Sequence, residues 1–289
     1  MKSIRAILLL SVFALAAFVG SCRSESSAPQ PDGPRVITLS PALTNIAFEI
    51  GVGGNIVGVS NYCRLPEDEP SRPAVGDARS VQTEAIASLR PDVILAQQQP
   101  RLFDTIRRVL PDVQIVQVTI ETLPDIASAA EKVGKAAGNP TAGSKAAQRF
   151  RDRLASVQQQ TDALDAPRVL FLMGYERPFA IGAGTFIDQM IRVAGGTNPA
   201  AEFTRYVRIS SENIVAARPD VLICQVDADD IPAAEAYFEQ LTDVPAVRNG
   251  RVHVVSDRGW TIPSLRLAEL TERLAAIIHP QLRPAEDTK

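Results

Sequence analysis

The chain has 289 residues, of which 45% are hydrophobic and 22% are charged, and its formal net charge is −3. These values exclude a disordered or fibrous chain. The mild acidity argues against nucleic acid as a partner, because nucleic acid is bound by basic surfaces. The length suffices for one large hydrophobic core or for two cores of roughly 100–150 residues each.

Residues 1–22 have the pattern of a bacterial secretory signal. Lys2 and Arg5 precede an apolar stretch that runs to Val19, and small residues follow it before Cys22. The stretch is too short to span a bilayer as a mature helix. The residues before Cys22 resemble a lipobox, so we expect Cys22 to be lipidated and to become the mature N-terminus. The alternative is a plain secreted protein with a coincidental cysteine.

Residues 23–34 are rich in Ser, Pro, Asp and Gly, which is typical of a flexible tether. No later segment contains 18 consecutive apolar residues, so the lipid is the only membrane attachment that we expect. We therefore expect a lipoprotein whose body works in the periplasm or on the cell surface.

The rest of the chain contains an internal repeat. Residues 83–95 and 211–223 share Glu, Ile, Arg, Pro, Asp and Val at a constant offset of 128. Each copy predicts a short helix, a Pro-Asp break and a buried strand. A repeat at this distance indicates two similar lobes rather than a solenoid.

Short β-branched runs alternate with helical patterns in both halves. Residues 35–39 and 168–172 predict the first strand of each lobe, and residues 113–118 predict a strand after the helical stretch 101–110. The alternation predicts an α/β fold in which each lobe has a parallel sheet covered by helices, as in Rossmann-like domains.

One long helix is expected to join the lobes, because residues 141–165 contain no Pro and no Gly after Gly143. At about 1.5 Å per residue it would measure roughly 35 Å and allow only limited rocking. The expected organisation is a signal (1–22), a tether (23–34), an N-terminal lobe (35–140), the interlobe helix (141–165), a C-terminal lobe (166–281) and a tail (282–289).

Two such lobes enclose a cleft at the carboxyl ends of their strands, where ligands bind in α/β sheets. The loops that follow the predicted strands contain aromatic, amide and charged side chains. The loop candidates for ligand contact are Tyr62, Arg64, Gln97, Asp257, Arg258 and Trp260. Cys224 lies in a buried-strand pattern and is interpreted as a core residue, although a disulfide with Cys63 remains open.

Several landmarks together resemble the periplasmic binding proteins with a helical backbone, which deliver cobalamin, ferric siderophores or haem to ABC importers. The resemblance covers residues 35–280. Its landmarks are the opening segment 35–42, residues 57–62, Gly76-Asp77 before Glu84, residues 194–198 and residues 247–253. It implies a protein that binds a ligand and delivers it to a permease dimer with an ATPase.

Within this family the chain looks most like the cobalamin branch. The resemblance implies that Tyr62, Phe179 and Tyr206 contact the ligand, with an acidic residue at Asp257. Ala78 departs from the pattern, because a large aromatic residue is expected there. The region after Asp257 has gained a residue, so Arg258 and Trp260 have no one-to-one match in the family.

The arginines favour a different ligand. Several of them fall at or near the predicted mouth of the cleft, and converging guanidinium groups would favour an anionic iron chelate or haem. They could equally be solvated surface residues. These arginines are Arg64, Arg79, Arg177, Arg205, Arg208 and Arg258. A ferric siderophore or haem is therefore the alternative to a corrinoid such as cobalamin.

Glu84 and Glu212 occupy equivalent positions in the repeat. The resemblance implies that they dock onto arginines of the permease dimer, with one negative contact per lobe. The alternative is a pair of solvated glutamates, which the helix dipole favours at helix starts.

Other classes of protein find little support in the sequence. The chain has only two histidines, and a zinc or manganese site needs several His and carboxylate ligands, so no metal site is expected. No dinucleotide fingerprint, nucleophile elbow or P-loop motif is present, so we expect neither an enzyme nor a cofactor. We expect a monomer. A ligand sensor remains an alternative to a transport component.

Overall fold

The computed structural model describes residues 32–77, 79–97 and 99–282. The signal, Cys22 and most of the tether lie outside these residues, as do Ala78, Gln98 and residues 283–289. The described residues all belong to one compact unit. Within the described residues, no helix combines the length and apolar character that a membrane span requires.

The first lobe is built on a four-stranded parallel sheet with strand order β2-β1-β3-β4. The strands β1 and β3 are buried throughout, as their β-branched sequences predict. The strands are β1 (Val36–Thr38), β2 (Ile56–Val59), β3 (Val93–Ala96) and β4 (Gln114–Gln117). The prediction of a parallel sheet is confirmed for this lobe.

The second lobe contains a five-stranded sheet with strand order β7-β6-β5-β8-β9. The strands β5, β8 and β9 are parallel, but β6 pairs antiparallel with both β5 and β7. The expected α/β class is confirmed, but this sheet is only mostly parallel, because the chain reverses directly after β5 at Gly174 (φ +78°). The strands are β5 (Val169–Met173), β6 (Phe179–Ile181), β7 (Tyr206–Arg208), β8 (Val221–Gln225) and β9 (Val252–Val255).

Helices cover the sheets and join the lobes. The α-helices are α2 (Pro41–Glu49), α3 (Thr83–Ser88), α4 (Asp104–Val109), α5 (Leu123–Ala136), α6 (Pro140–Thr161), α7 (Phe186–Val193), α8 (Ser211–Ala217), α9 (Ile231–Glu239), α10 (Pro245–Arg248) and α11 (Leu267–Ile278). The 3-10 helices are η1 (Gly53–Asn55), η2 (Pro100–Phe103), η3 (Ala228–Asp230), η4 (Arg258–Thr261) and η5 (Pro280–Leu282).

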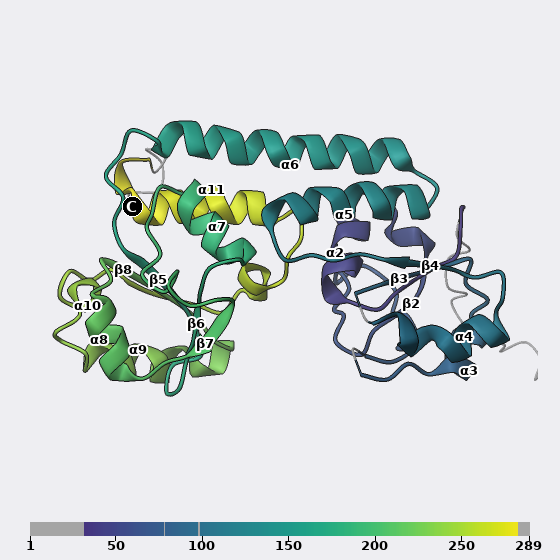
Figure 1. Ribbon diagram of the computed structural model, residues 1–289, viewed down its shortest axis with the longest axis horizontal. Coiled ribbons are helices and arrows are strands. Elements are labelled where there is room, and N and C mark those ends of the chain that lie inside the picture. The colour runs from purple at the N-terminus through teal and green to yellow at the C-terminus, as the bar shows by residue number, and fades with distance from the viewer. Residues whose placement is uncertain (1–31, 78, 98, 283–289) are drawn as a thin grey trace, which may run out of the picture. The chain divides into compact units, whose positions relative to one another are not determined.

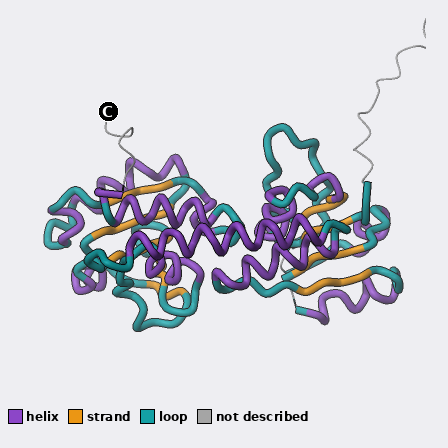
Figure 2. Tube along the Cα trace, turned by 90° about the horizontal axis from the view of Figure 1, so that it is seen from above, coloured by secondary structure: helices purple, strands orange, loops and turns teal. Residues whose placement is uncertain are grey.

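The long helix α6 runs across both lobes (Figure 1; Figure 2). It ends at Thr161, before the expected end at residue 165. It does not act alone, because α5 from the first lobe and α11 from the second pack along it. The connection between the lobes is therefore a layer of helices, which is stiffer than a single helix.

The internal repeat is visible in matching contacts at the start of each lobe. The Arg35 backbone N–H donates to Asp92 Oδ2 at 2.7 Å, and the Arg35 guanidinium donates to the Leu89 carbonyl at 2.9 Å. In the second lobe the same bonds measure 2.8 and 2.7 Å and involve Arg168, Asp220 and Ala217. In each lobe an arginine before the first strand thus holds the turn Arg-Pro-Asp, which follows helix α3 in the first lobe and helix α8 in the second.

Gly143 allows α6 to approach α5 closely. A Cβ at this position would lie 2.5 Å from the Ala130 carbonyl oxygen, which is backbone and cannot move aside. Replacing a helical Gly by Ala ordinarily stabilises a protein by about 1 kcal/mol. We predict the opposite sign for Gly143→Ala, a loss of about 1–3 kcal/mol in the free energy of unfolding. Denaturant unfolding measures it, with Gly54→Ala as the control, because a Cβ at Gly54 meets nothing within 4 Å. Unchanged or higher stability of Gly143→Ala would contradict the prediction.

Candidate functional site

A cavity of about 650 Å³ lies between the two lobes. The first lobe contributes Pro41 and Tyr62, which follow β1 and β2, and the second lobe contributes residues that follow β5, β8 and β9. The cavity therefore lies at the carboxyl ends of the parallel strands, where loops are free to carry binding residues. Its lining consists of Pro41, Tyr62, Met173, Gly174, Tyr175, Glu176, Phe179, Gln225, Val226, Asp227, Asp230, Arg258, Thr261 and Ile262.

Two smaller cavities share residues with this one. A cavity of about 340 Å³ adds Asn45, Arg64, Ala228 and Ser256, and shares Tyr62 and Arg258. A cavity of about 280 Å³ adds Ile187 and Tyr206, and shares Phe179. We call the three together the interlobe cleft. The structure thus brings five of the expected ligand residues into one cleft, namely Tyr62, Arg64, Phe179, Tyr206 and Arg258.

Aromatic side chains line the interlobe cleft from both lobes. Tyr62, after β2, is 71% exposed, and Phe179 and Tyr206 on the paired strands β6 and β7 are 38% and 48% exposed. Such exposure of large rings costs free energy unless a ligand covers them. Tyr175 joins them from the loop after β5, and its ring packs edge-on against Tyr237 at 6.0 Å.

Two phenols of the cleft, those of Tyr175 and Tyr206, have raised pKa values. Desolvation raises the pKa of Tyr206, and desolvation together with the charge of Asp230 raises the pKa of Tyr175. Each hydroxyl can therefore donate a hydrogen bond to a ligand as well as accept one.

The charges of the interlobe cleft nearly balance. Its lining contains three carboxylates, from Glu176, Asp227 and Asp230, and two guanidinium groups, from Arg64 and Arg258, which gives a formal charge of −1. Arg258 donates to Asp227 Oδ1 at 2.9 Å and is therefore partly neutralised within the protein.

The other arginines at the mouth do not converge on the interlobe cleft. Arg205 pairs with Glu121 at 2.7 Å, and the Arg208 guanidinium lies 4.8 Å from the centre of the Phe179 ring. Arg79 and Arg177 are exposed and line none of its three cavities. The sequence predicted that these arginines lie near the mouth. The partners of Arg205 and Arg208 are distant in the chain, so the sequence alone could not identify them.

Three expected ligand residues, Gln97, Asp257 and Trp260, lie off the lining of the interlobe cleft. Gln97, after β3, accepts a hydrogen bond from the Ser40 hydroxyl. The Asp257 carboxylate pairs with Arg266 at 2.7 Å and accepts from the Gly259 backbone N–H at 2.8 Å. The acidic residue that does line the cleft in this region is Asp227, at the end of β8.

Trp260 is not a ligand residue in this structure, and the expectation that it contacts the ligand is wrong. Its side chain is fully buried in the hydrophobic core, with its ring centre 6.2 Å from that of Phe171. The Asp257 carboxylate caps η4 through the Gly259 N–H, and the short turn that follows directs the indole inward. Thr261 and Ile262 reach the cleft in its place.

Glu84 and Glu212 occupy matching positions in the two lobes. Each is exposed in the first turn of its repeat helix, α3 or α8. In Figure 1 both helices lie on the side of the sheets away from α6. Hydrogen bonds from the Ser210 side chain and from backbone N–H groups lower the pKa of Glu212, which therefore stays ionised at neutral pH.

Both cysteines of the described residues are free. Cys224 is buried in β8, as expected for a core residue, and burial raises the pKa of its thiol to about 12. Cys63 lies in the loop beside Tyr62, with its Sγ 3.0 Å from the Thr44 hydroxyl. The possible disulfide between them is not formed. Across the described residues, no group of three or more His, Cys, Asp or Glu side chains is placed to hold a metal ion.

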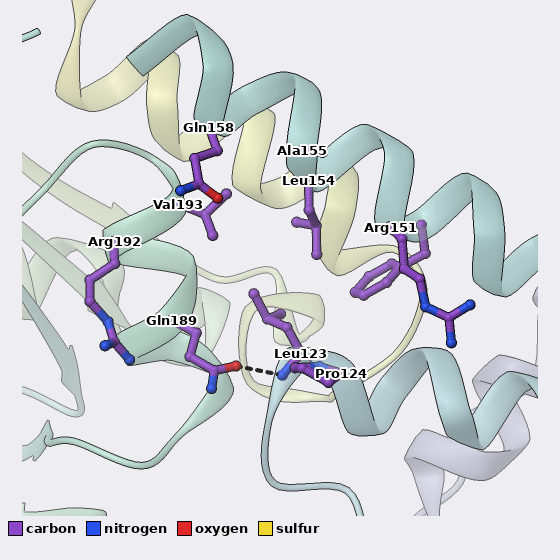
Figure 3. Close-up of a pocket in the computed structure, with 10 residues that line it drawn as sticks. Leu123, Pro124, Arg151, Leu154, Ala155, Gln158, Gln189, Arg192 and Val193 are labelled. Carbon is purple, nitrogen blue, oxygen red and sulfur yellow. Dashed lines mark hydrogen bonds between the residues drawn. The ribbon is translucent and has the colours of Figure 1, made fainter. Parts of the chain in front are cut away.

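Another cavity of about 650 Å³ lies among the helices that join the lobes rather than at the ends of the strands (Figure 3). It is lined by the start of α5, the middle of α6 and the face of α7 that carries Gln189 and Arg192. Below it the Leu123 backbone N–H donates to Gln189 Oε1 at 2.7 Å, which links the two lobes. No expected ligand residue lines this cavity. The interlobe cleft is therefore the candidate site.

Sequence reasoning missed several residues of the interlobe cleft, including Tyr175, Glu176 and Asp227. All three directly follow a strand. The rule that ligands bind at the carboxyl ends of strands points to the loop of Tyr175 and Glu176, but it does not single out which residues of a loop face the cleft.

The fold and the site define a class of protein in which two α/β lobes, joined by a stiff helical layer, hold a ligand between them. The family model described as "Periplasmic binding protein" matches residues 36–258. The chain therefore belongs to the periplasmic binding protein family. Members of this family are binding proteins rather than enzymes.

Similar proteins agree with this assignment. The chain is 29% identical to a cobalamin-binding protein of Halobacterium salinarum, covering 85% of this chain and 69% of that protein. It is 27% identical to an uncharacterized ABC transporter substrate-binding lipoprotein of Bacillus subtilis, covering 85% and 80% of the two chains.

Solved structures share the fold. The periplasmic vitamin B12 binding protein of Vibrio cholerae superposes with a TM-score of 0.74 at 24% identity, covering 87% of this chain and 99% of that chain. The periplasmic heme-binding protein of Roseiflexus superposes with a TM-score of 0.73 at 25% identity, covering 87% and 100%. Proteins named for corrinoid and for haem binding thus share this architecture.

Proposed function

We propose that this protein captures cobalamin or a related corrinoid in the interlobe cleft and delivers it to the permease of an ABC importer. The observation that carries the proposal is the lining of the cleft. Its aromatic rings come from both lobes, and its formal charge is close to zero. A corrin is a large, flat ring system with a rim of neutral amides, so it needs aromatic surface and neutral hydrogen-bonding groups.

The size of the cleft supports a ligand of this class. A drug-sized pocket has roughly 300–1,000 Å³, and the three cavities of the cleft measure about 650, 340 and 280 Å³. Tyr62 stands on the first lobe, and Tyr175 and Phe179 stand on the second. A flat ligand held between the lobes would cover rings on both of its sides.

The same lining argues against a strongly anionic ligand. A ferric siderophore with several ionised groups, or haem with its two propionates, is best matched by several unpaired guanidinium groups. Only Arg64 and Arg258 line the cleft, and Arg258 pairs with Asp227. The three carboxylates would repel such a ligand. Calorimetric titration of the protein with cyanocobalamin, ferric siderophores and haem tests the proposal.

The delivery step rests on Glu84 and Glu212. Their matching exposed positions on two repeat-related helices suit a partner with two-fold symmetry. The helical layer of α5, α6 and α11 would permit only small changes in the angle between the lobes, so the permease must pull the loaded lobes apart.

The protein is further proposed to be a lipid-anchored monomer. The support is the lipobox-like sequence that ends at Cys22, together with a relative named as a lipoprotein. The mass of the mature N-terminal peptide tests the anchor, and an unmodified Cys22 in that peptide would refute it.

A further inference from the structure

The lobes meet at a polar contact outside the interlobe cleft. Glu49, the last residue of α2 in the first lobe, accepts three hydrogen bonds from the segment that leads into α11 of the second lobe. The donors are the Ser264 hydroxyl at 2.7 Å, the Leu265 backbone N–H at 2.8 Å and the Arg266 backbone N–H at 3.3 Å. A carboxylate of one lobe therefore binds the backbone N–H groups of the two residues that precede a helix of the other lobe.

This contact continues toward the cleft through an ion pair. The Arg266 guanidinium makes two bonds to the Asp257 carboxylate, at 2.7 and 3.0 Å. Asp257 also accepts from the Gly259 N–H, at the start of η4. Arg258 and Thr261, which begin and end η4, both line the cleft. A continuous series of hydrogen bonds therefore runs from Glu49 to the residues that would touch the ligand.

The loop of η4 is packed tightly against this ion pair. A Cβ at Gly259 would lie 2.8 Å from Arg266 Nη1 and 2.9 Å from Asp257 Oδ1. Trp260, the next residue, is fully buried beneath the loop. Because the loop rests on the buried Trp260 and is bonded to Asp257, we expect a shift of Arg266 and Asp257 to displace Arg258 and Thr261 as well.

The first-lobe partner is equally fixed. Glu49 ends the same helix whose first residue, Pro41, lines the cleft. The helix α2 thus extends from the cleft to the Glu49 contact, and its middle is buried in the core. Both ends of the connection are therefore anchored to parts of the cleft, one in each lobe.

We propose that Glu49 is a positioning residue for ligand binding. It holds residues 264–266, and through Arg266 and Asp257 it sets the place of Arg258 and Thr261 in the interlobe cleft. Glu49 itself does not line that cleft. The proposal rests on the proposed function for the nature of the ligand, but the state of the η4 loop can be read without any ligand.

The test uses Glu49→Ala and Glu49→Gln. Glu269→Ala is the matched control, because Glu269 is an exposed carboxylate in the first turn of the same helix α11. Trp260 is the only tryptophan of the chain and lies in η4, so its fluorescence reports on this loop. Glu49 is exposed, so its replacement should leave the fold intact.

Without ligand, we expect Glu49→Ala to raise the acrylamide quenching of Trp260 at least about twofold, Glu49→Gln to do so less, and Glu269→Ala to have no effect. With cyanocobalamin, we expect Glu49→Ala to raise Kd roughly 5- to 50-fold. Most of this effect should vanish in an Arg258→Ala background, because the two residues act as a unit.

Unchanged quenching of Trp260 in Glu49→Ala, or an equal loss of affinity with and without Arg258, would overturn the proposal. Failure of the wild-type protein to bind cyanocobalamin would instead refute the proposed ligand, while the quenching experiment would still decide the role of Glu49.

Discussion

Replacing Tyr62 by alanine is expected to weaken cobalamin binding by about 10- to 100-fold, because a stacked aromatic residue at the centre of a binding site contributes about 1.5–3 kcal/mol. Tyr62 is the main aromatic contribution of the first lobe to the interlobe cleft. Its ring is 71% exposed in the empty protein, so the substitution should leave the free energy of unfolding almost unchanged. The loss of affinity would therefore report on the ligand contact and not on the fold. Isothermal titration and thermal unfolding measure the two quantities.

Phe203→Ala is the matched control. Phe203 is also an aromatic residue with an exposed side chain (39% exposed), but it lines none of the three cavities of the interlobe cleft. It should leave the Kd for cobalamin within about twofold of wild type. Phe179→Ala should weaken binding from the other lobe, because Phe179 also lines the interlobe cleft. Equal Kd values for Tyr62→Ala and Phe203→Ala would show that the ligand does not lie on Tyr62.

Replacing Glu84 and Glu212 together by alanine is expected to reduce cobalamin uptake by whole cells by about 10- to 100-fold, while the Kd of the purified protein stays unchanged. Each glutamate would lose one charged contact with the permease, and such contacts contribute about 1–2 kcal/mol each at an interface. Neither residue lines the interlobe cleft, so ligand binding has no reason to change. Uptake of labelled cobalamin at limiting amounts of binding protein measures the effect.

The control is a second pair of exposed glutamates with one residue on each lobe, Glu67 and Glu239. Their double replacement removes the same formal charge and should leave uptake near the wild-type rate. The single variants Glu84→Ala and Glu212→Ala should each cause a smaller loss than the double variant, because the permease would still hold one lobe. Normal uptake by the Glu84 and Glu212 double variant would refute docking through these residues.

The sequence predicts the core strands well, because burial on both faces demands uninterrupted β-branched runs. The runs before Ala96 and Gln225 are examples, and both lie in the expected strands β3 and β8. The repeat also predicts the second lobe from the first, down to the corner formed by Asp92 and Asp220. The antiparallel strands β6 and β7 are not predictable in this way, since they have three residues each and carry no clear period.

The site is predicted less well than the fold, for physical reasons that individual residues show. Trp260 follows a strand end as Tyr62 does, but η4 turns the indole into the core, and this turn depends on hydrogen bonds to Asp257. The arginines looked like a cationic cluster because their counter-charges are remote in sequence. Arg205, for example, pairs with a carboxylate 84 residues away. Side-chain partners of this kind become visible only when the lobes are placed together.

The central claim is that the interlobe cleft binds a corrinoid. Calorimetric titration of the purified protein with cyanocobalamin, a panel of ferric siderophores and haem tests it most directly. We predict tight binding of cyanocobalamin and binding at least about 100-fold weaker for the anionic ligands, because the aromatic and nearly neutral lining fits the first and not the others. Tight binding of a ferric siderophore or of haem, with no heat from cyanocobalamin, would contradict the account and would assign the recognition to Arg64 and Arg258 instead of the aromatic rings.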